Sequence, residues 1–165
     1  MSYVIGCDPG SMGAFVVLDD KGNIISKHTM PLKKKVGTKN GKELDVRELV
    51  KLLYGLSVYN PTLWLERVWG QPKQSSVATF NFGKSFGILI GVVETIGIPI
   101  KYVAPRTWQS KLLDKGSGDT KDRSISTVKR LYPDESFIPK GCRKESDGLT
   151  DACLIALYGL REEKK

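Results

Sequence analysis

Hydrophobic positions cluster into three short runs at the start of the chain and predict three strands. Residues 2–8 and 14–18 are almost continuously apolar, and residues 24–30 follow a polar turn at 20–23. Apolar runs of this length, bounded by Gly, Pro and Asn, are typical of buried strands. The short connections between them predict an antiparallel meander.

Beyond residue 44 the apolar spacing changes to a helical period. Asp45 and Glu48 resemble a capping box, and the leucines at 49, 52, 53 and 56 form one apolar stripe, so a helix should begin at Asp45. Asn60-Pro61 then breaks the chain before another short apolar run that ends at Glu66. We expect the remaining elements to be helices near 76–96, 106–113, 120–131 and 146–161 and a strand at 98–103. This order predicts a mixed α/β sheet flanked by helices.

The long helix expected at 76–96 has glycines at 83, 87 and 91, which fall on one face. Such a face allows another helix to approach closely, either within the chain or in a dimer, and we favour the dimer. The apolar run Phe86–Val93 stops at Glu94, and we interpret it as part of a buried helix. No run of 18 apolar residues and no secretory leader pattern is found, so we expect a soluble, intracellular protein without a membrane span. The length of 165 residues predicts one domain over 1–165.

Cysteine usage and charge narrow the chemistry. The three cysteines are widely spaced, no CxxC pair occurs, and His28 is the only histidine, so a zinc site of Cys and His is poorly supported. Cys7 and Cys153 lie in apolar surroundings and are expected in the core. The net charge of +8, from 26 basic against 18 acidic residues, favours a polyanionic partner.

Four carboxylates carry the strongest functional signal. Asp8 and Glu66 each close an apolar strand, and Asp147 and Asp151 stand one helical turn apart. A carboxylate at the end of a buried strand is costly unless it is paired or binds a metal. Ordinary alternatives are a turn aspartate, a strand-end surface acid and a helix cap. Together, however, the four acids predict a divalent-cation site for phosphoryl chemistry on nucleic acid.

Two further segments have residues suited to nucleic acid. Residues 31–42 hold five lysines and two glycines, and we expect a mobile basic loop that either touches a phosphate backbone or is simply solvated. Trp69 lies three residues beyond Glu66, where it can stack on unpaired bases or pack in the core. Phe80 and Phe82 flank Asn81, and we expect at least one of them to pack internally.

These features, in this order, resemble the RuvC family of Holliday-junction resolvases in the ribonuclease H-like superfamily, especially its phage-encoded branch. The resemblance covers most of the chain. The matching segments are residues 5–10, 65–68, 80–87, 97–99, 103–105, 147–152 and 154–159. Cellular members usually space the last two acids i,i+3, whereas here the spacing is i,i+4, which agrees with the phage branch and leaves the role of Asp147 less defined than that of Asp151.

The resemblance implies a ribonuclease H-like mixed five-stranded sheet flanked by helices, and it assigns roles to residues. Asp8, Glu66, Asp147 and Asp151 would ligate two Mg²⁺ ions, for which Mn²⁺ can substitute. Lys121 would stabilise charge on the scissile phosphate, although it is equally consistent with a plain surface lysine. Trp69 would wedge between bases at the junction. The expected DNA-binding set is Trp69, Phe80, Lys84, Lys115, Lys121 and Arg123.

The function implied is symmetric nicking of four-way junctions and related branched DNA, leaving 5′-phosphate and 3′-hydroxyl ends. A homodimer is expected because two strands must be cut, in the cytoplasm of a bacterial host if the gene is phage-encoded. Two alternatives stay open: a less selective nuclease of the same fold acting on branched DNA or RNA–DNA hybrids, and a junction-binding protein that does not cut. Gly83-Lys84-Ser85 imitates a P-loop ending, but Ala78 stands where the earlier glycine is required.

Overall fold

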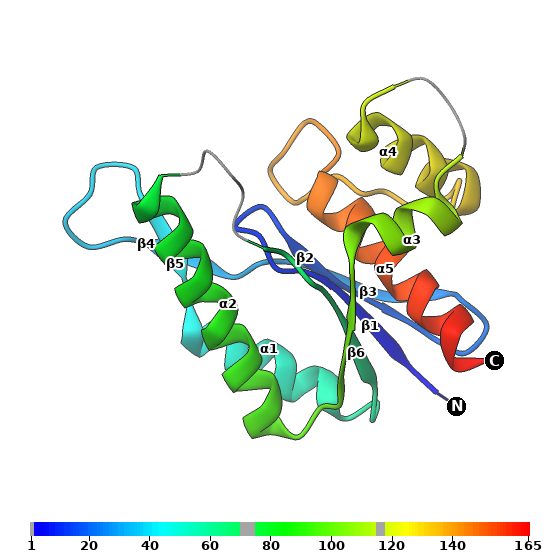
Figure 1. The fold of residues 1–165 in the computed structure, drawn as a ribbon, viewed down its shortest axis with the longest axis horizontal. Coiled ribbons are helices and arrows are strands. Elements are labelled where there is room, and N and C mark those ends of the chain that lie inside the picture. Colours follow the sequence, from blue (N-terminus) through cyan, green and yellow to red (C-terminus); the bar gives the residue numbers. More distant parts are fainter. Residues whose placement is uncertain (1, 70–74, 115–117) are drawn as a thin grey trace.

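Five strands form one mixed sheet in the computed structural model, which describes residues 2–69, 75–114 and 118–165. The strand order is β3-β2-β1-β6-β7 (Figure 1). β1 pairs antiparallel with β2 and parallel with β6, so the meander and the parallel half meet at β1. The strands are β1 (Val4–Asp8), β2 (Ala14–Leu18), β3 (Ile24–Thr29), β6 (Thr62–Glu66) and β7 (Ile100–Val103). The predicted mixed five-stranded sheet is confirmed.

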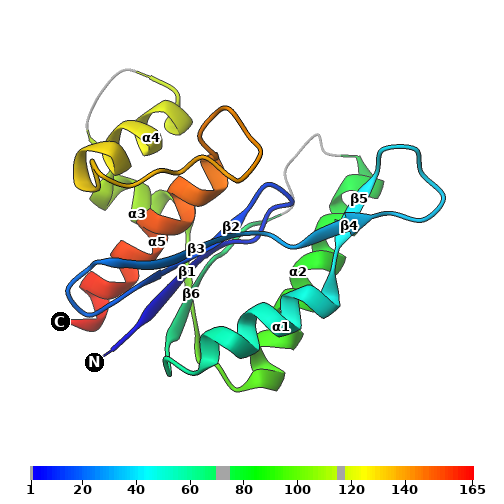
Figure 2. The same ribbon diagram turned by 180° about the vertical axis from the view of Figure 1, so that it is seen from behind.

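Helices cover both faces of this sheet. Figures 1 and 2 show α1 and α2 on one face and α3, α4 and α5 on the other. Two buried apolar clusters, one on each side, follow this division, and the expected core cysteines Cys7 and Cys153 each belong to one of them. The helices are α1 (Val46–Ser57), α2 (Ser76–Ile96), α3 (Pro105–Leu112), α4 (Thr120–Leu131) and α5 (Asp147–Glu163). Each of the predicted helices is therefore present, within two residues of the expected bounds.

The helix α5 packs against the centre of the sheet without side-chain spacers on β1. A Cβ atom at Gly6 would lie 2.0 Å from the Ala152 carbonyl oxygen and 2.3 Å from the Ala156 nitrogen. At the start of the helix, a Cβ at Gly148 would lie 2.0 Å from the Met12 carbonyl oxygen. Glycine at both positions therefore brings the first turns of α5 directly onto β1 and the turn that follows it.

The basic segment after β3 is ordered differently from our expectation. Instead of a mobile loop, it forms an antiparallel hairpin of β4 (Leu32–Lys34) and β5 (Lys42–Leu44). Leu32 opposite Leu44 gives the hairpin an apolar base, and both residues pack into the core cluster on the α1–α2 face. The sequence did not predict this pairing because the segment between Leu32 and Leu44 is rich in lysine.

The exposure of α2 also corrects a prediction. Phe86–Val93 was expected in a buried helix, yet within it only Leu89 and Val93 are buried. The helix is long and apolar enough to cross a membrane by length and composition alone, and 11% of its most apolar window is buried. The reason is geometric: α2 rests one narrow face on α1 and the sheet and turns its glycine face outward, where a Cβ at Gly83, Gly87 or Gly91 would meet nothing within 4 Å.

Candidate functional site

The ends of β1 and β6 place two carboxylates side by side. The strands are parallel neighbours with Cys7 opposite Leu65, so Asp8 and Glu66 follow at the same edge of the sheet. Both side chains are partly buried. The Gly10 backbone N–H donates a hydrogen bond of 3.2 Å to Asp8 Oδ1, which ties the first carboxylate to the turn after β1.

The start of α5 brings the other two acids to the same place. Ser146 caps this helix by accepting a hydrogen bond from the Leu149 N–H, and Asp147 occupies the first turn. The charge of Asp147 acts on Asp8, and the charge of Asp151 acts on Glu66. The fold thus gathers four acids that lie as far as 143 positions apart in the sequence.

Crowding and burial raise the pKa of these acids. Burial is the main cause for Glu66, whose pKa rises to about 7, with added repulsion from Asp8 and Asp151. Burial likewise raises the pKa of Asp151 to about 6, and the nearby Ser124 partly offsets this rise. The pKa of Asp8 is also raised, chiefly by burial. Carboxylates that repel one another in a partly dry site are stabilised in their charged form by a cation.

Trp108 forms a hydrogen bond with Glu66 that the sequence did not predict. Its indole Nε1–H donates a hydrogen bond of 2.8 Å to Glu66 Oε1, and its side chain is fully buried. This bond lowers the pKa of Glu66 against the larger effect of burial. The contact fixes one oxygen of the carboxylate. No local pattern in the sequence marks it, because the two residues are joined only by the packing of α3 against the sheet edge.

Lys121 pairs with one of the four acids. Its ammonium lies 2.9 Å from Asp147 Oδ2, and the side chain of Lys121 is largely exposed whereas that of Asp147 is partly exposed. This ion pair raises the pKa of Lys121. The first turn of α4 therefore puts a positive charge beside Asp147.

The donor set fits a hard divalent cation by its chemistry. Asp151 Oδ1 is buried and accepts no hydrogen bond from any residue that the structure describes. Carboxylate oxygens are the ligands that Mg²⁺ and Mn²⁺ prefer. Within residues 2–69, 75–114 and 118–165, however, no three acidic, histidine or cysteine side chains stand close enough to hold one ion as placed. Binding would require the carboxylates to draw together, with Asp147 exchanging its pairing with Lys121.

The residues expected to bind DNA occupy different surroundings. Trp69 is 67% exposed and Phe80 70% exposed, so neither is a core residue. The Arg67 guanidinium lies 4.7 Å from the centre of the Trp69 ring. Lys84 is exposed in the middle of α2, which also excludes a P-loop at Gly83-Lys84-Ser85. Phe82 stacks on Phe86 with ring centres 5.9 Å apart, the packing role expected for one of the two phenylalanines.

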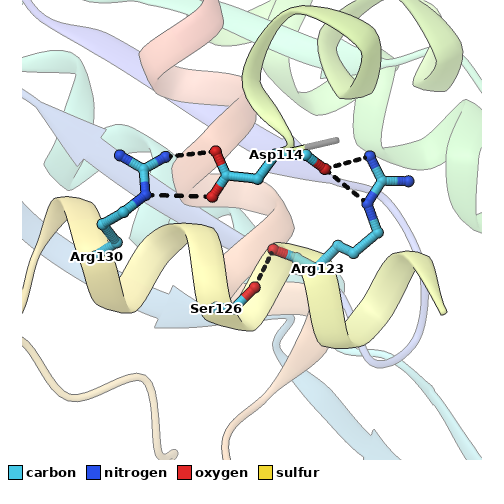
Figure 3. A network of polar contacts seen from close by, with 4 residues as sticks. All are labelled: Asp114, Arg123, Ser126 and Arg130. Carbon is cyan, nitrogen blue, oxygen red and sulfur yellow. Dashed lines mark hydrogen bonds and ion pairs between the residues drawn. The ribbon is translucent and has the colours of Figure 1, made fainter. Parts of the chain in front are cut away.

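The arginine Arg123 has an internal partner. Its Nε and Nη2 donate hydrogen bonds of 3.0 and 2.8 Å to the Asp114 backbone oxygen (Figure 3). Arg130 holds the Asp114 carboxylate through two further bonds of 3.2 and 2.9 Å. These contacts tie the end of α3 to α4 and so position the helix that carries Lys121. Lys115 lies outside the described residues.

Comparison with known proteins identifies the fold. The chain superposes on Thermus thermophilus RuvC in complex with a Holliday junction substrate with a TM-score of 0.66 at 16% identity, over 99% of this chain and 96% of that one. A second Thermus thermophilus RuvC structure matches with a TM-score of 0.59 at 15% identity, over 98% and 96% of the two chains. No family model and no curated protein matches the sequence. The chain therefore has a ribonuclease H-like fold of the RuvC type.

Proposed function

We propose that this chain is a metal-dependent, structure-selective endodeoxyribonuclease that nicks four-way junctions and related branched DNA. The observation that carries the proposal is the convergence of Asp8, Glu66, Asp147 and Asp151 from three elements onto one edge of the sheet. The RuvC-type fold and the net charge of +8 support it. The i,i+4 spacing of Asp147 and Asp151 favours a relationship with the phage-encoded branch.

The four carboxylates would hold two Mg²⁺ ions, or Mn²⁺ in their place. When bound, such ions activate water and neutralise charge that develops on the phosphate and on the leaving oxygen. Trp108 keeps one Glu66 oxygen in a fixed direction, leaving the other free to bind an ion. Lys121, which is paired with Asp147, would pair with a non-bridging phosphate oxygen. The products would carry 5′-phosphate and 3′-hydroxyl ends.

Two symmetric nicks require two active sites, and we infer a homodimer for that reason. The exposed glycine face of α2 is the surface that we assign to the dimer contact. We further infer that residues 1–165 act as one nuclease domain, in the cytoplasm of a bacterial host if the gene is phage-encoded. Trp69, exposed three residues beyond Glu66, would stack on bases that the junction leaves unpaired.

Cleavage of end-labelled DNA in Mg²⁺ tests the proposal. Four-way junction, three-way fork, RNA–DNA hybrid and linear duplex with the same arm sequences are compared. We expect paired symmetric nicks in the four-way junction, reduced more than about a hundredfold in Asp8→Asn, Glu66→Gln and Asp151→Asn. Asp134→Asn, which changes an exposed acid outside the cluster, is the matched control and should cut normally.

Other outcomes select other functions. Equal cutting of fork and junction, or cutting of the hybrid alone, would assign the chain to a broader nuclease of this fold. Tight junction binding without cleavage in Mg²⁺ or Mn²⁺ would make it a junction-binding protein. Normal cleavage by all three acid variants would refute the assignment of the active site.

A further inference from the structure

A pocket of about 330 Å³ opens beside the candidate active site. Its walls are the turn that follows Asp8, the β4–β5 hairpin and the first half of α2. Pro9, Gly10 and Ser11 of that turn line it, so the pocket begins one residue beyond a predicted metal ligand. It is therefore within reach of the same nucleic-acid strand.

The lining combines a flat apolar wall with polar groups. Phe82 and aliphatic side chains from the hairpin and α2 supply the wall, whereas Asn81 and Ser85 stand one helical turn apart on α2. An amide both donates and accepts hydrogen bonds, as the edge of a nucleobase does. The volume lies at the small end of the range for organic ligands, which suits a single base better than a larger group.

A second hollow, of about 480 Å³, adjoins this pocket on the hairpin. Leu32 and Lys42 line both, so the two hollows are neighbours. The second hollow is lined by four lysines: Lys33, Lys34, Lys39 and Lys42. Only one of them has an ion pair among the described residues, a 3.7 Å contact between Lys33 and Glu43. The hairpin thus offers unneutralised positive charge next to a pocket with the chemistry of a base site.

We propose that the pocket between α2 and the hairpin takes one unstacked nucleobase of the bound DNA strand, close to the cut phosphate, while the hairpin lysines hold the neighbouring phosphates. This inference rests on the proposed function. A flipped or unstacked base matches the apolar wall, the polar groups and the neighbouring lysines, because it is flat, has a polar edge and is joined to phosphates on one side. The consequence is a base preference beside the cleavage point, set by Asn81 and Ser85.

Fluorescence of 2-aminopurine tests the pocket without cleavage. The base is placed at successive positions around the cut site of a four-way junction, and full-length protein is added in EDTA. Unstacking increases the emission of 2-aminopurine, so we expect a rise at one position with the wild type. Ser85→Phe, which fills the pocket, should abolish that rise. Val58→Phe, at an exposed position at the end of α1 that lines neither hollow, should retain it.

Cleavage in Mg²⁺ supplies the second readout. On junctions carrying each of the four bases at the responding position, the wild type should prefer one base by about tenfold, and Asn81→Ala should flatten this preference. A wild type that cuts junctions but shows neither the fluorescence rise nor a base preference overturns this inference and leaves the proposed function intact. Saturable binding of free dAMP that Ser85→Phe removes, with no change in 2-aminopurine emission on the junction, also overturns it. A wild type that neither binds nor cuts branched DNA overturns the proposed function itself, and this inference with it.

The hairpin is tested separately through salt dependence. Each phosphate contact that is lost should lower the slope of log binding constant against log salt concentration by about one. We expect Lys34→Gln with Lys39→Gln to lower it by about two. Lys21→Gln with Lys164→Gln removes the same charge from exposed sites outside the hairpin and should leave the slope near the wild-type value. Equal slopes for both double variants would overturn the role of the hairpin.

Discussion

The Trp108 indole determines how Glu66 presents its carboxylate. One oxygen accepts the 2.8 Å hydrogen bond, and the charges of Asp8 and Asp151 act on the carboxylate. Asp8, Glu66 and Asp147 could be singled out because each ends or begins an element, and Asp151 because it lies one helical turn beyond Asp147. Trp108 could not, because its partner is 42 residues away and α3 brings it there only in the folded protein.

Replacing Trp108 by Phe should weaken metal binding. The variant keeps an aromatic ring but loses the N–H donor, so the pKa of Glu66 rises further and less of it is charged at neutral pH. We expect a loss of about 10–100-fold in Mg²⁺ affinity or cleavage rate, with the pH profile moved to higher pH. Trp64→Phe is the control, because the Trp64 N–H donates to Glu163, which is not one of the four acids. Equal losses and unmoved pH profiles in both variants would leave Trp108 a packing residue only.

The acid cluster should also make stability depend on pH and metal together. In EDTA, Glu66 and Asp151 have folded pKa values of about 7 and about 6, above their ordinary values, so the folded state binds more protons than the unfolded state. Its stability therefore falls as pH rises from about 4 to about 7. Mg²⁺ binds the charged acids and should raise Tm more at about pH 7.5 than at about pH 5.5. Differential scanning fluorimetry measures both, and an equal Mg²⁺ shift in Asp8→Asn would contradict a site at these residues.

The positions of most helices and strands could be predicted from the sequence, but the pairing of β4 with β5 and the exposure of α2 could not. Helical periodicity and caps placed α1 through α5 within two residues, because these signals are local. The β4–β5 hairpin was missed because its pairing is anchored by Leu32 and Leu44, twelve residues apart across a lysine-rich segment. The exposure of α2 was missed because an apolar helix has the same pattern whether it faces a core or a partner chain.

The packing of α5 on β1 predicts a sharp effect of one methyl group. Gly6→Ala would place a Cβ 2.0 Å from the backbone oxygen of Ala152, and backbone cannot move aside as a side-chain tip can. We expect a loss of about 3 kcal/mol or more in the free energy of unfolding, measured by urea denaturation. Gly55→Ala, in open space on α1, should instead be neutral or stabilising by about 0.5–1 kcal/mol. Similar stabilities of the two variants would show that α5 does not lie this close.

The helices on the two faces of the sheet differ in how deeply they are buried. α5, on one face, is buried along most of its length, whereas α2, on the other face, buries only two side chains among the described residues. Val77 and Phe80 extend the exposed apolar surface of α2 toward its N-terminus, near the candidate active site. A second copy seated on this helix would cover apolar surface that costs free energy in water and would set two active sites at a fixed separation.

The substitution Gly87→Leu distinguishes a dimer contact from a free surface, because the two cases change Tm in opposite directions. If α2 faces solvent, leucine is the better helix former and raises Tm. If α2 packs against a second copy, the added side chain enters the contact, the protein becomes monomeric, and Tm falls and ceases to depend on protein concentration. We expect the second result, measured by sedimentation equilibrium and thermal unfolding. Gly55→Leu, at an equally open site on α1, is the control that should remain dimeric. A wild type that is monomeric at all concentrations would contradict the dimer and would require each nick to be an independent event.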